Sequence, residues 1–175
     1  MANVDAPNGF RVIKKQEQLT KYPVDSNNST AIFKGDLVKL EADGNIAPAE
    51  AGAGNVVVGV AVGLQDSNGK ALEYLPASTA GYALVADDPR CLFVVQADSG
   101  TSVAASDVGA TADHVAGAGS TTSGDSGHEL DSSDIGTGGQ LQIIGKEEVH
   151  GNDWGEHVNL IVRIAEHAYN TKASI

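Results

Sequence analysis

Basic residues are scarce in this 175-residue chain, and their scarcity bears on its partners. Lysine and arginine together number 11, against 23 aspartates and glutamates, and the formal net charge is −12. Proteins that bind nucleic acids use clustered positive charge to neutralise phosphates. We therefore expect no nucleic-acid partner, and an acidic surface that keeps the protein in solution.

Cysteine, aromatic residues and long apolar runs are also in short supply. Cys91 is the single cysteine, which excludes a disulfide within the chain, and its apolar neighbours favour a buried, inert thiol. Aromatic residues make up 5%, so we expect a core of Val, Ile, Leu and Ala. No apolar stretch approaches the length of about 20 residues that spans a membrane. The first residues lack a signal-peptide pattern, so we expect synthesis in the cytoplasm and no membrane partner.

Glycine is abundant, and the chain has the pattern of a β protein. Its 21 glycines lie mostly among Ser, Thr, Asp and Asn, a mixture typical of turns. The runs between these turns are short and rich in β-branched residues, which predicts strands. The expected strands are 37–40, 56–63, 71–75, 82–86, 91–97, 140–145 and 158–164. The pattern predicts an all-β fold, a small barrel or sandwich with long Gly/Ser-rich loops.

Two segments depart from this pattern. Residues 1–30 are polar with isolated apolar residues, which predicts an extended N-terminal arm on its own surface or a partner's; a loosely ordered terminus is the alternative. Residues 31–175 are expected to form a single β-barrel-like domain. A long loop insertion at about 98–139, rich in Gly, Ser, Thr, Ala and Asp, interrupts it. One short helical turn is expected near 106–112.

The sequence holds one short catalytic-looking motif. Gly124-Asp125-Ser126-Gly127 is similar to the nucleophile motif of trypsin-like serine proteases, and His114 lies nearby in the chain. A catalytic triad of that family needs its histidine and serine on separate barrels, and this chain is too short for two. We therefore expect no catalytic residue.

The histidines and the tryptophan are the other residue types that often take part in binding. The histidines lack the spacing of a zinc site, so we expect no metal or cofactor and place these residues on the surface: His114, His128, His150, His157 and His167. Trp154 lies in a polar turn, where it is either an interface anchor or a side chain folded over the rim of the core.

Several short segments, in order along the chain, together carry a likeness to one family. They are 1–10, 33–38, 44–49, 58–61, 82–89, 93–98, 130–133, 141–145 and 162–167. In these segments the chain resembles the head decoration proteins, or capsid cement proteins, of tailed bacteriophages. Their order and extent carry the resemblance, since no single segment is specific, and residues 99–129 match nothing in it.

The resemblance implies a structural protein and not an enzyme. Such a protein binds the outer surface of an expanded phage head at capsomer junctions and stabilises it. Its partner would be the major capsid protein lattice, and it would be a homo-oligomer, with a trimer favoured and a dimer possible. It would be made in the host bacterial cytoplasm and reside on the outer capsid surface of the virion. The expected interface residues are Val4, Phe10, Val12, Ile13, Tyr22 and Trp154.

Other functions stay open at this point. The chain could be another virion component, such as a head fibre, neck or tail protein. A small serine hydrolase using Ser126 and His114, or a carbohydrate-binding module, are further alternatives. Carbohydrate-binding modules usually present several exposed aromatic residues, and this chain has one Trp and four Tyr.

Overall fold

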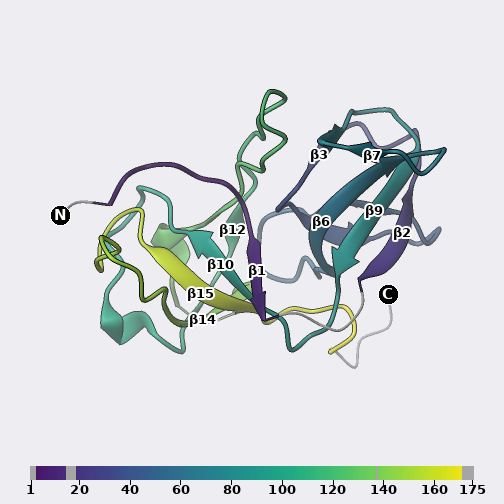
Figure 1. The fold of residues 1–175 in the computed structure, drawn as a ribbon. Helices are drawn as coiled ribbons and strands as arrows, with labels where there is room; N and C mark the ends of the chain where they lie inside the picture. Colours follow the sequence, from purple (N-terminus) through teal and green to yellow (C-terminus); the bar gives the residue numbers. More distant parts are fainter. Residues whose placement is uncertain (1–2, 15–18, 137, 171–175) are drawn as a thin grey trace.

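The computed structural model of the protein describes residues 3–14, 19–136 and 138–170, and in these residues the fold is all-β (Figure 1). Named strands pair antiparallel throughout, and the described residues hold no α-helix and no sheet closed into a barrel. Two short 3-10 turns, η1 (Ala105–Asp107) and η2 (Ser132–Asp134), complete the regular structure. The all-β prediction is confirmed, and the open sheets are consistent with the sandwich alternative and not with a barrel.

One half of the molecule is built on a five-stranded sheet. Its strand order is β1-β10-β15-β14-β11, which places β1 at one edge. Apolar and more exposed residues alternate along the strands of this sheet. Along β15, for example, Leu160, Val162 and Ile164 are buried while Arg163 is exposed. The strands are β1 (Arg11–Lys14), β10 (Leu92–Gln96), β11 (Thr111–Ala112), β14 (Leu141–Lys146) and β15 (Asn159–Ile164).

The other half contains a six-stranded sheet with β2 at one edge. Its order is β2-β9-β6-β4-β5, and β7 pairs with β6. The long strand β6 begins within the β-branched run expected as a strand at 56–63 and continues three residues beyond it, to Asp66. The strands are β2 (Thr20–Val24), β4 (Leu37–Leu40), β5 (Ile46–Pro48), β6 (Gly59–Asp66), β7 (Ala71–Leu72) and β9 (Gly81–Ala86). Two small pairs flank the sheets: β3 (Ile32–Phe33) with β8 (Tyr74–Leu75), and β12 (His114–Val115) with β13 (Glu129–Leu130).

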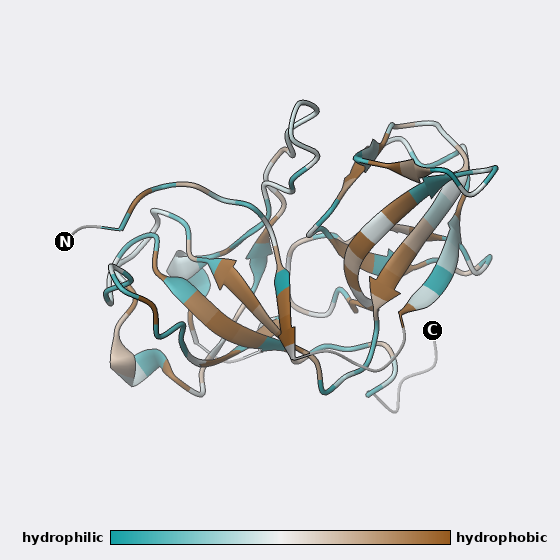
Figure 2. Ribbon diagram, viewed as in Figure 1, coloured by the Kyte–Doolittle hydropathy of each residue, from teal (hydrophilic) through white to brown (hydrophobic). Residues whose placement is uncertain are grey.

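A shared apolar core joins the two halves. The larger cluster of buried side chains includes Phe93 and Val162 of the first sheet together with Leu37 and Val60 of the second. A smaller cluster fills the second half alone. Figure 2 shows the apolar residues concentrated on the strands and the polar ones on the connecting loops. Cys91 is buried beside the larger cluster, as its apolar neighbours predict.

The N-terminal segment, expected as an extended arm on its own surface or a partner's, is extended and pairs with the sheets of its own chain. Strand β1 pairs with β10 and strand β2 with β9, so the N-terminal residues supply an edge strand to each sheet. These strands escape sequence reasoning because an edge strand needs few apolar residues; Thr20, Lys21 and Pro23 of β2 are exposed. A proline is tolerated at such an edge, where its missing N–H breaks no inner ladder.

The segment expected as a loop insertion is more ordered than its composition suggests. It contains both 3-10 turns and the short strands β11, β12 and β13, and several of its residues are buried. The helical turn expected near 106–112 is η1, and it ends before β11 begins. Beyond β12 and β13 the chain rises as a narrow loop (Figure 1), where a Cβ on Gly117 would lie 2.0 Å from the Gly127 carbonyl oxygen. Glycine permits this close backbone approach.

Candidate functional site

One of the six expected interface residues belongs to the core, and three more are partly buried against it. Phe10 is 3% exposed and meets Phe93 edge to face, with ring centroids 6.5 Å apart. Val12 and Trp154 are half-buried and pack against the larger apolar cluster. Trp154 therefore follows the alternative of a side chain folded over the core. Phe10 is not available to a partner.

Tyr22 is held in a hydrogen-bonded group at the edge strand β2. Its hydroxyl donates to Asp87 Oδ2 at 2.7 Å and lies 2.6 Å from the hydroxyl of Tyr169. Burial, followed by the hydrogen bonds with Tyr169 and Asp87, raises the pKa of Tyr22 well above its usual value. Its hydroxyl is thereby committed to contacts within the chain.

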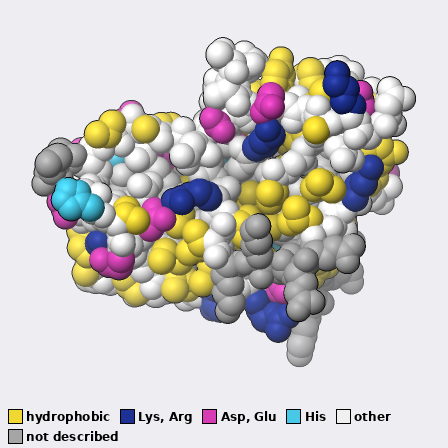
Figure 3. Space-filling model, in the orientation of Figure 1, with side chains coloured by type: hydrophobic (Ala, Val, Ile, Leu, Met, Phe, Trp, Pro, Cys, Tyr) yellow, Lys and Arg dark blue, Asp and Glu magenta, His cyan; other side chains and the backbone are white. Residues whose placement is uncertain are grey.

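Val4 and Ile13 remain as exposed apolar residues of the N-terminal segment, with 74% and 43% of their surface accessible. Ile13 lies on β1, and both β1 and β2 end the strand order of their sheets among the described residues. The outward backbone groups of an edge strand can pair with a strand from another chain. On the face in Figure 3, apolar side chains gather over both halves, with charged residues scattered between them. The N-terminal segment thus supplies two edge strands and two exposed apolar side chains.

A buried polar cluster brings Ser126 next to residues that lie far from it in the sequence. The backbone of the loop around Asp125 pairs with that of Lys34: Lys34 N donates to Gly124 O, and Ser126 N donates to Lys34 O. This pairing places Ser126 and His128 beside Asp36. Asp36 Oδ2 accepts from the Phe33 amide at 2.8 Å, and the Ser126 side chain also hydrogen bonds to Asp36.

Two histidines complete the buried cluster. His128 Nδ1 accepts from the Leu37 amide at 3.3 Å, which leaves the ring proton on Nε2, 3.5 Å from Asp36 Oδ1. His114 lies next to His128, with ring centroids 5.1 Å apart, and its Nδ1 is 2.7 Å from Gln140 Oε1. Burial raises the pKa of Asp36 to about 6. Burial, and then the neighbouring His114, lower the pKa of His128 to about 3, and burial lowers that of His114.

This arrangement differs from a hydrolytic triad. Ser126 and His114 are each 1% exposed. The Ser126 hydroxyl accepts from the His128 backbone amide at 2.9 Å, whereas the ring nitrogen Nδ1 of His114 is directed at Gln140. The cluster therefore acts as a polar layer of the core. Sequence reasoning missed Asp36 and His128, although His128 follows the Gly-Asp-Ser-Gly motif directly.

The prediction of surface histidines is wrong for three of the five. His114, His128 and His167 are 1%, 4% and 0% exposed. Neutral imidazole can be buried when its surroundings lower its pKa, and burial lowers the pKa of His167 as well. The sequence shows no sign of this because no regular apolar pattern surrounds these histidines.

A second group of ionisable residues lies at the other end of the first half. One ligand-type atom each from Asp5, Glu129 and His157 lies within 4.8 Å of the other two. His157 Nδ1 is 3.8 Å from Asp5 Oδ1. Burial, and then the charges of Asp5 and Asp98, raise the pKa of Glu129. These three residues are the candidate metal ligands of the described chain, and sequence reasoning, which expected no metal, did not group them.

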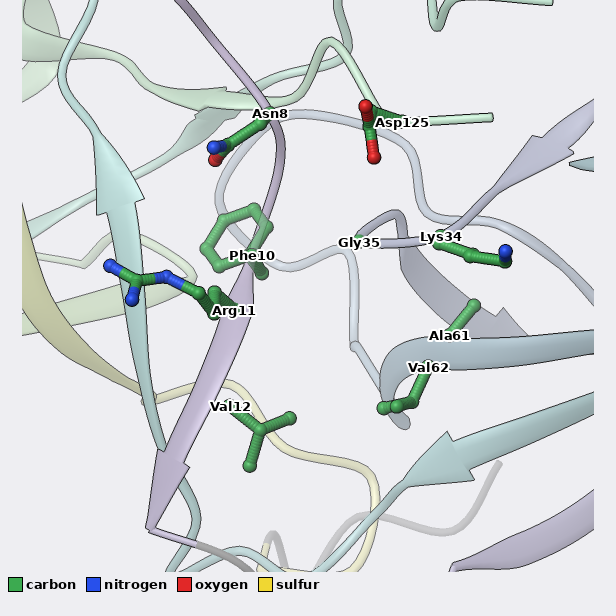
Figure 4. A pocket seen from close by; sticks show the side chains of 9 residues that line it. All are labelled: Asn8, Phe10, Arg11, Val12, Lys34, Gly35, Ala61, Val62 and Asp125. Carbon is green, nitrogen blue, oxygen red and sulfur yellow. The ribbon is translucent and has the colours of Figure 1, made fainter. Parts of the chain in front are cut away.

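A cleft of about 360 Å³ lies between β1 and β6, where the two halves meet (Figure 4). Its basic residues are already paired: Arg11 with Glu147 at 2.8 Å and Lys34 with Glu73 at 2.5 Å. Apolar groups make up much of the remaining lining, including Val62, which is 38% exposed. The cleft is therefore a partly apolar surface with an ion pair on each side.

Comparison with protein-family models, curated proteins and solved structures finds no match for this chain. No helix in the described residues is long and apolar enough to cross a membrane.

Proposed function

We propose that this chain is a structural decoration protein that binds the outer surface of an expanded phage head and stabilises it. The observation that carries the proposal is edge strand β1, which the N-terminal segment supplies and which bears the exposed side chain of Ile13. A coat-protein strand that adds to this edge gains main-chain hydrogen bonds without a deep pocket. Ile13 on β1 and Val4 in the segment before it add exposed apolar side chains.

The charge of the chain fits a position on the outside of the shell. A net charge of −12 repels packaged DNA and keeps a solvent-facing protein soluble. The described core is built from short, tightly packed strands, and the polar cluster around Asp36 is buried in it. A tightly packed domain of this kind can serve as a structural element without a catalytic site.

Stabilisation of a shell follows from mass action. A protein that binds the assembled lattice and not its separate subunits shifts the equilibrium toward the lattice. Many copies act together, so modest contacts per copy are sufficient, and a homo-oligomer, with a trimer favoured, multiplies them further.

The test is co-sedimentation of the purified chain with heads of the phage that encodes it. We expect saturable binding to expanded heads, weaker binding to unexpanded ones, and a higher temperature of head disruption when the protein is bound. Microscopy of these heads should show a regular array at capsomer junctions. Failure to bind either form of head, or density confined to the neck or tail, would overturn the proposal.

A further inference from the structure

Asp5, Glu129 and His157 come from three separate parts of the chain and converge on one point. Asp5 lies in the N-terminal segment before β1, Glu129 begins β13, and His157 lies in the loop before β15. Their ligand-type atoms are within 4.8 Å of one another. Ligand atoms around one tetrahedral zinc ion lie about 3.3 Å apart, as follows from bonds of about 2.0–2.2 Å. Small side-chain movements would therefore bring the three onto a common ion.

Two polar atoms of this group are buried and lack a hydrogen-bond partner among the described residues. Glu129 Oε1 and His157 Nδ1 each have almost no accessible surface and no hydrogen bond among the described residues. An unsatisfied buried polar atom is costly, and native structures usually supply a partner, a water or an ion. The free electron pairs of a carboxylate oxygen and an imidazole nitrogen are both suited to a metal.

The surrounding residues hold the ligands in place. Gln96 Nε2 donates to the carbonyls of Val4 and His157, and Gln96 Oε1 accepts from the Ala6 amide at 2.9 Å. One buried glutamine thus fixes the backbone on both sides of Asp5 and at His157. Asn3 adds to this support, because its side chain bonds to the backbone of Asp153 and Glu156. A site whose backbone is already positioned loses less entropy when an ion binds.

We propose that Asp5, Glu129 and His157 bind a divalent transition-metal ion of the zinc type. One imidazole nitrogen and two carboxylate oxygens match the donors that zinc accepts, with water in a fourth position, whereas magnesium and calcium prefer oxygen alone. The nearby carboxylate of Asp98 adds negative charge that favours a cation. The ion would join the N-terminal segment to β13 and the 153–157 loop, and so hold the segment that leads into edge strand β1. Metal binding at this site does not depend on whether the chain decorates a capsid.

The experiment is calorimetric titration of the full, untagged and chelator-treated chain with Zn²⁺. We expect one ion per chain, bound in the presence of excess Mg²⁺, and a higher melting temperature with Zn²⁺. Glu129→Gln, Asp5→Asn and His157→Asn should each weaken binding more than the roughly 10- to 100-fold caused by loss of an outer hydrogen-bond partner. Asparagine is chosen at position 157 because His157 has φ 55°, a region that asparagine tolerates.

Two exposed residues supply matched controls. His150→Gln and Glu148→Gln remove the same donor types outside the cluster and should leave zinc affinity unchanged. The Glu129→Gln variant should also lose the zinc-dependent protection of residues 3–6 from hydrogen exchange. Absence of a one-to-one site in the wild-type chain, equal weakening in the His150→Gln control, or equal competition by Mg²⁺ would each overturn the proposal.

Discussion

The imidazole Nε2 of His128 lies 3.5 Å from the carboxylate Oδ1 of Asp36, and both side chains are almost fully buried. The pKa of each is moved toward its neutral form, to about 6 for Asp36 and about 3 for His128. At neutral pH the His128 imidazole is therefore neutral, whereas the Asp36 carboxylate is ionised although its buried surroundings favour the neutral form. The pair makes stability depend on pH in a way that a variant can isolate.

We expect Asp36→Asn to stabilise the protein at pH 8. The folded-state pKa of Asp36 is raised, so its contribution to stability is full below its usual pKa of 3.8 and is lost as the pH rises through about 6. Above that pH the wild type carries a buried charge, which asparagine removes while it can still accept from the Phe33 amide. The gain should approach about 3 kcal/mol at pH 8 and fall toward zero by pH 4.

Urea unfolding of both proteins at several pH values measures this difference. The lowered pKa of His128 acts in the opposite direction: its contribution is full above 6.5 and is lost as the pH falls toward about 3. Both proteins share it, so it cancels in the comparison. Asp125→Asn removes an exposed carboxylate as a control and should show no such trend. A pH-independent effect of Asp36→Asn would contradict the expectation.

Phe10→Ala should destabilise the protein by about 3–5 kcal/mol, because it removes a fully buried ring and its edge-to-face contact with Phe93. Ile13→Ala, three residues later on the exposed side of β1, should change stability by about 0.5 kcal/mol or less. Denaturant titration distinguishes the two. Equal small effects of the two substitutions would mean that Phe10 is not buried in the core.

The sequence predicted the inner strands well because burial leaves a strong pattern there. Buried residues alternate along β15, and valines recur along β6, because each strand packs an apolar face against the core. The edge strands β1 and β2 left little pattern, since one side of each faces solvent. Their assignment depends on pairing with β9 and β10, which lie more than fifty residues away along the chain.

The two ionisable clusters were hidden for a related reason. Asp36 and His128 are brought together by backbone pairing between Lys34 and Asp125. Nothing in the sequence of either segment indicates that it pairs with the other. Asp5, Glu129 and His157 likewise have no regular spacing. Spacing rules detect ligands that share one helix or hairpin, whereas these residues are assembled by the tertiary fold.

Gly9→Ala should destabilise the protein more than Gly44→Ala. Both glycines have a positive φ, 71° and 85°, so each alanine carries a left-handed strain of about 1–2 kcal/mol. A Cβ on Gly9 would also lie 2.4 Å from Ser126 Cβ and 2.7 Å from the Gly35 carbonyl oxygen, whereas Gly44 faces open space. The additional overpacking should cost about 1–3 kcal/mol, measured by thermal and urea unfolding. Equal losses in the two variants would mean that the N-terminal segment is not packed against the 124–128 loop.

Ile13→Lys tests the β1 edge as the contact with the capsid. Ile13 is 43% exposed and lies on an edge strand, where lysine is compatible with the fold but opposes addition of a further strand. We expect an unchanged melting temperature and at least a tenfold loss of affinity for expanded heads, since loss of one apolar anchor beside a charged edge costs about 1–3 kcal/mol per copy. Val108→Lys changes a residue of similar exposure, 45%, just after η1, and is expected to bind normally. Co-sedimentation at several protein concentrations gives both affinities. If Ile13→Lys binds as the wild type does, the β1 edge is not the capsid contact. Lys21→Glu on β2 would then test the other edge strand.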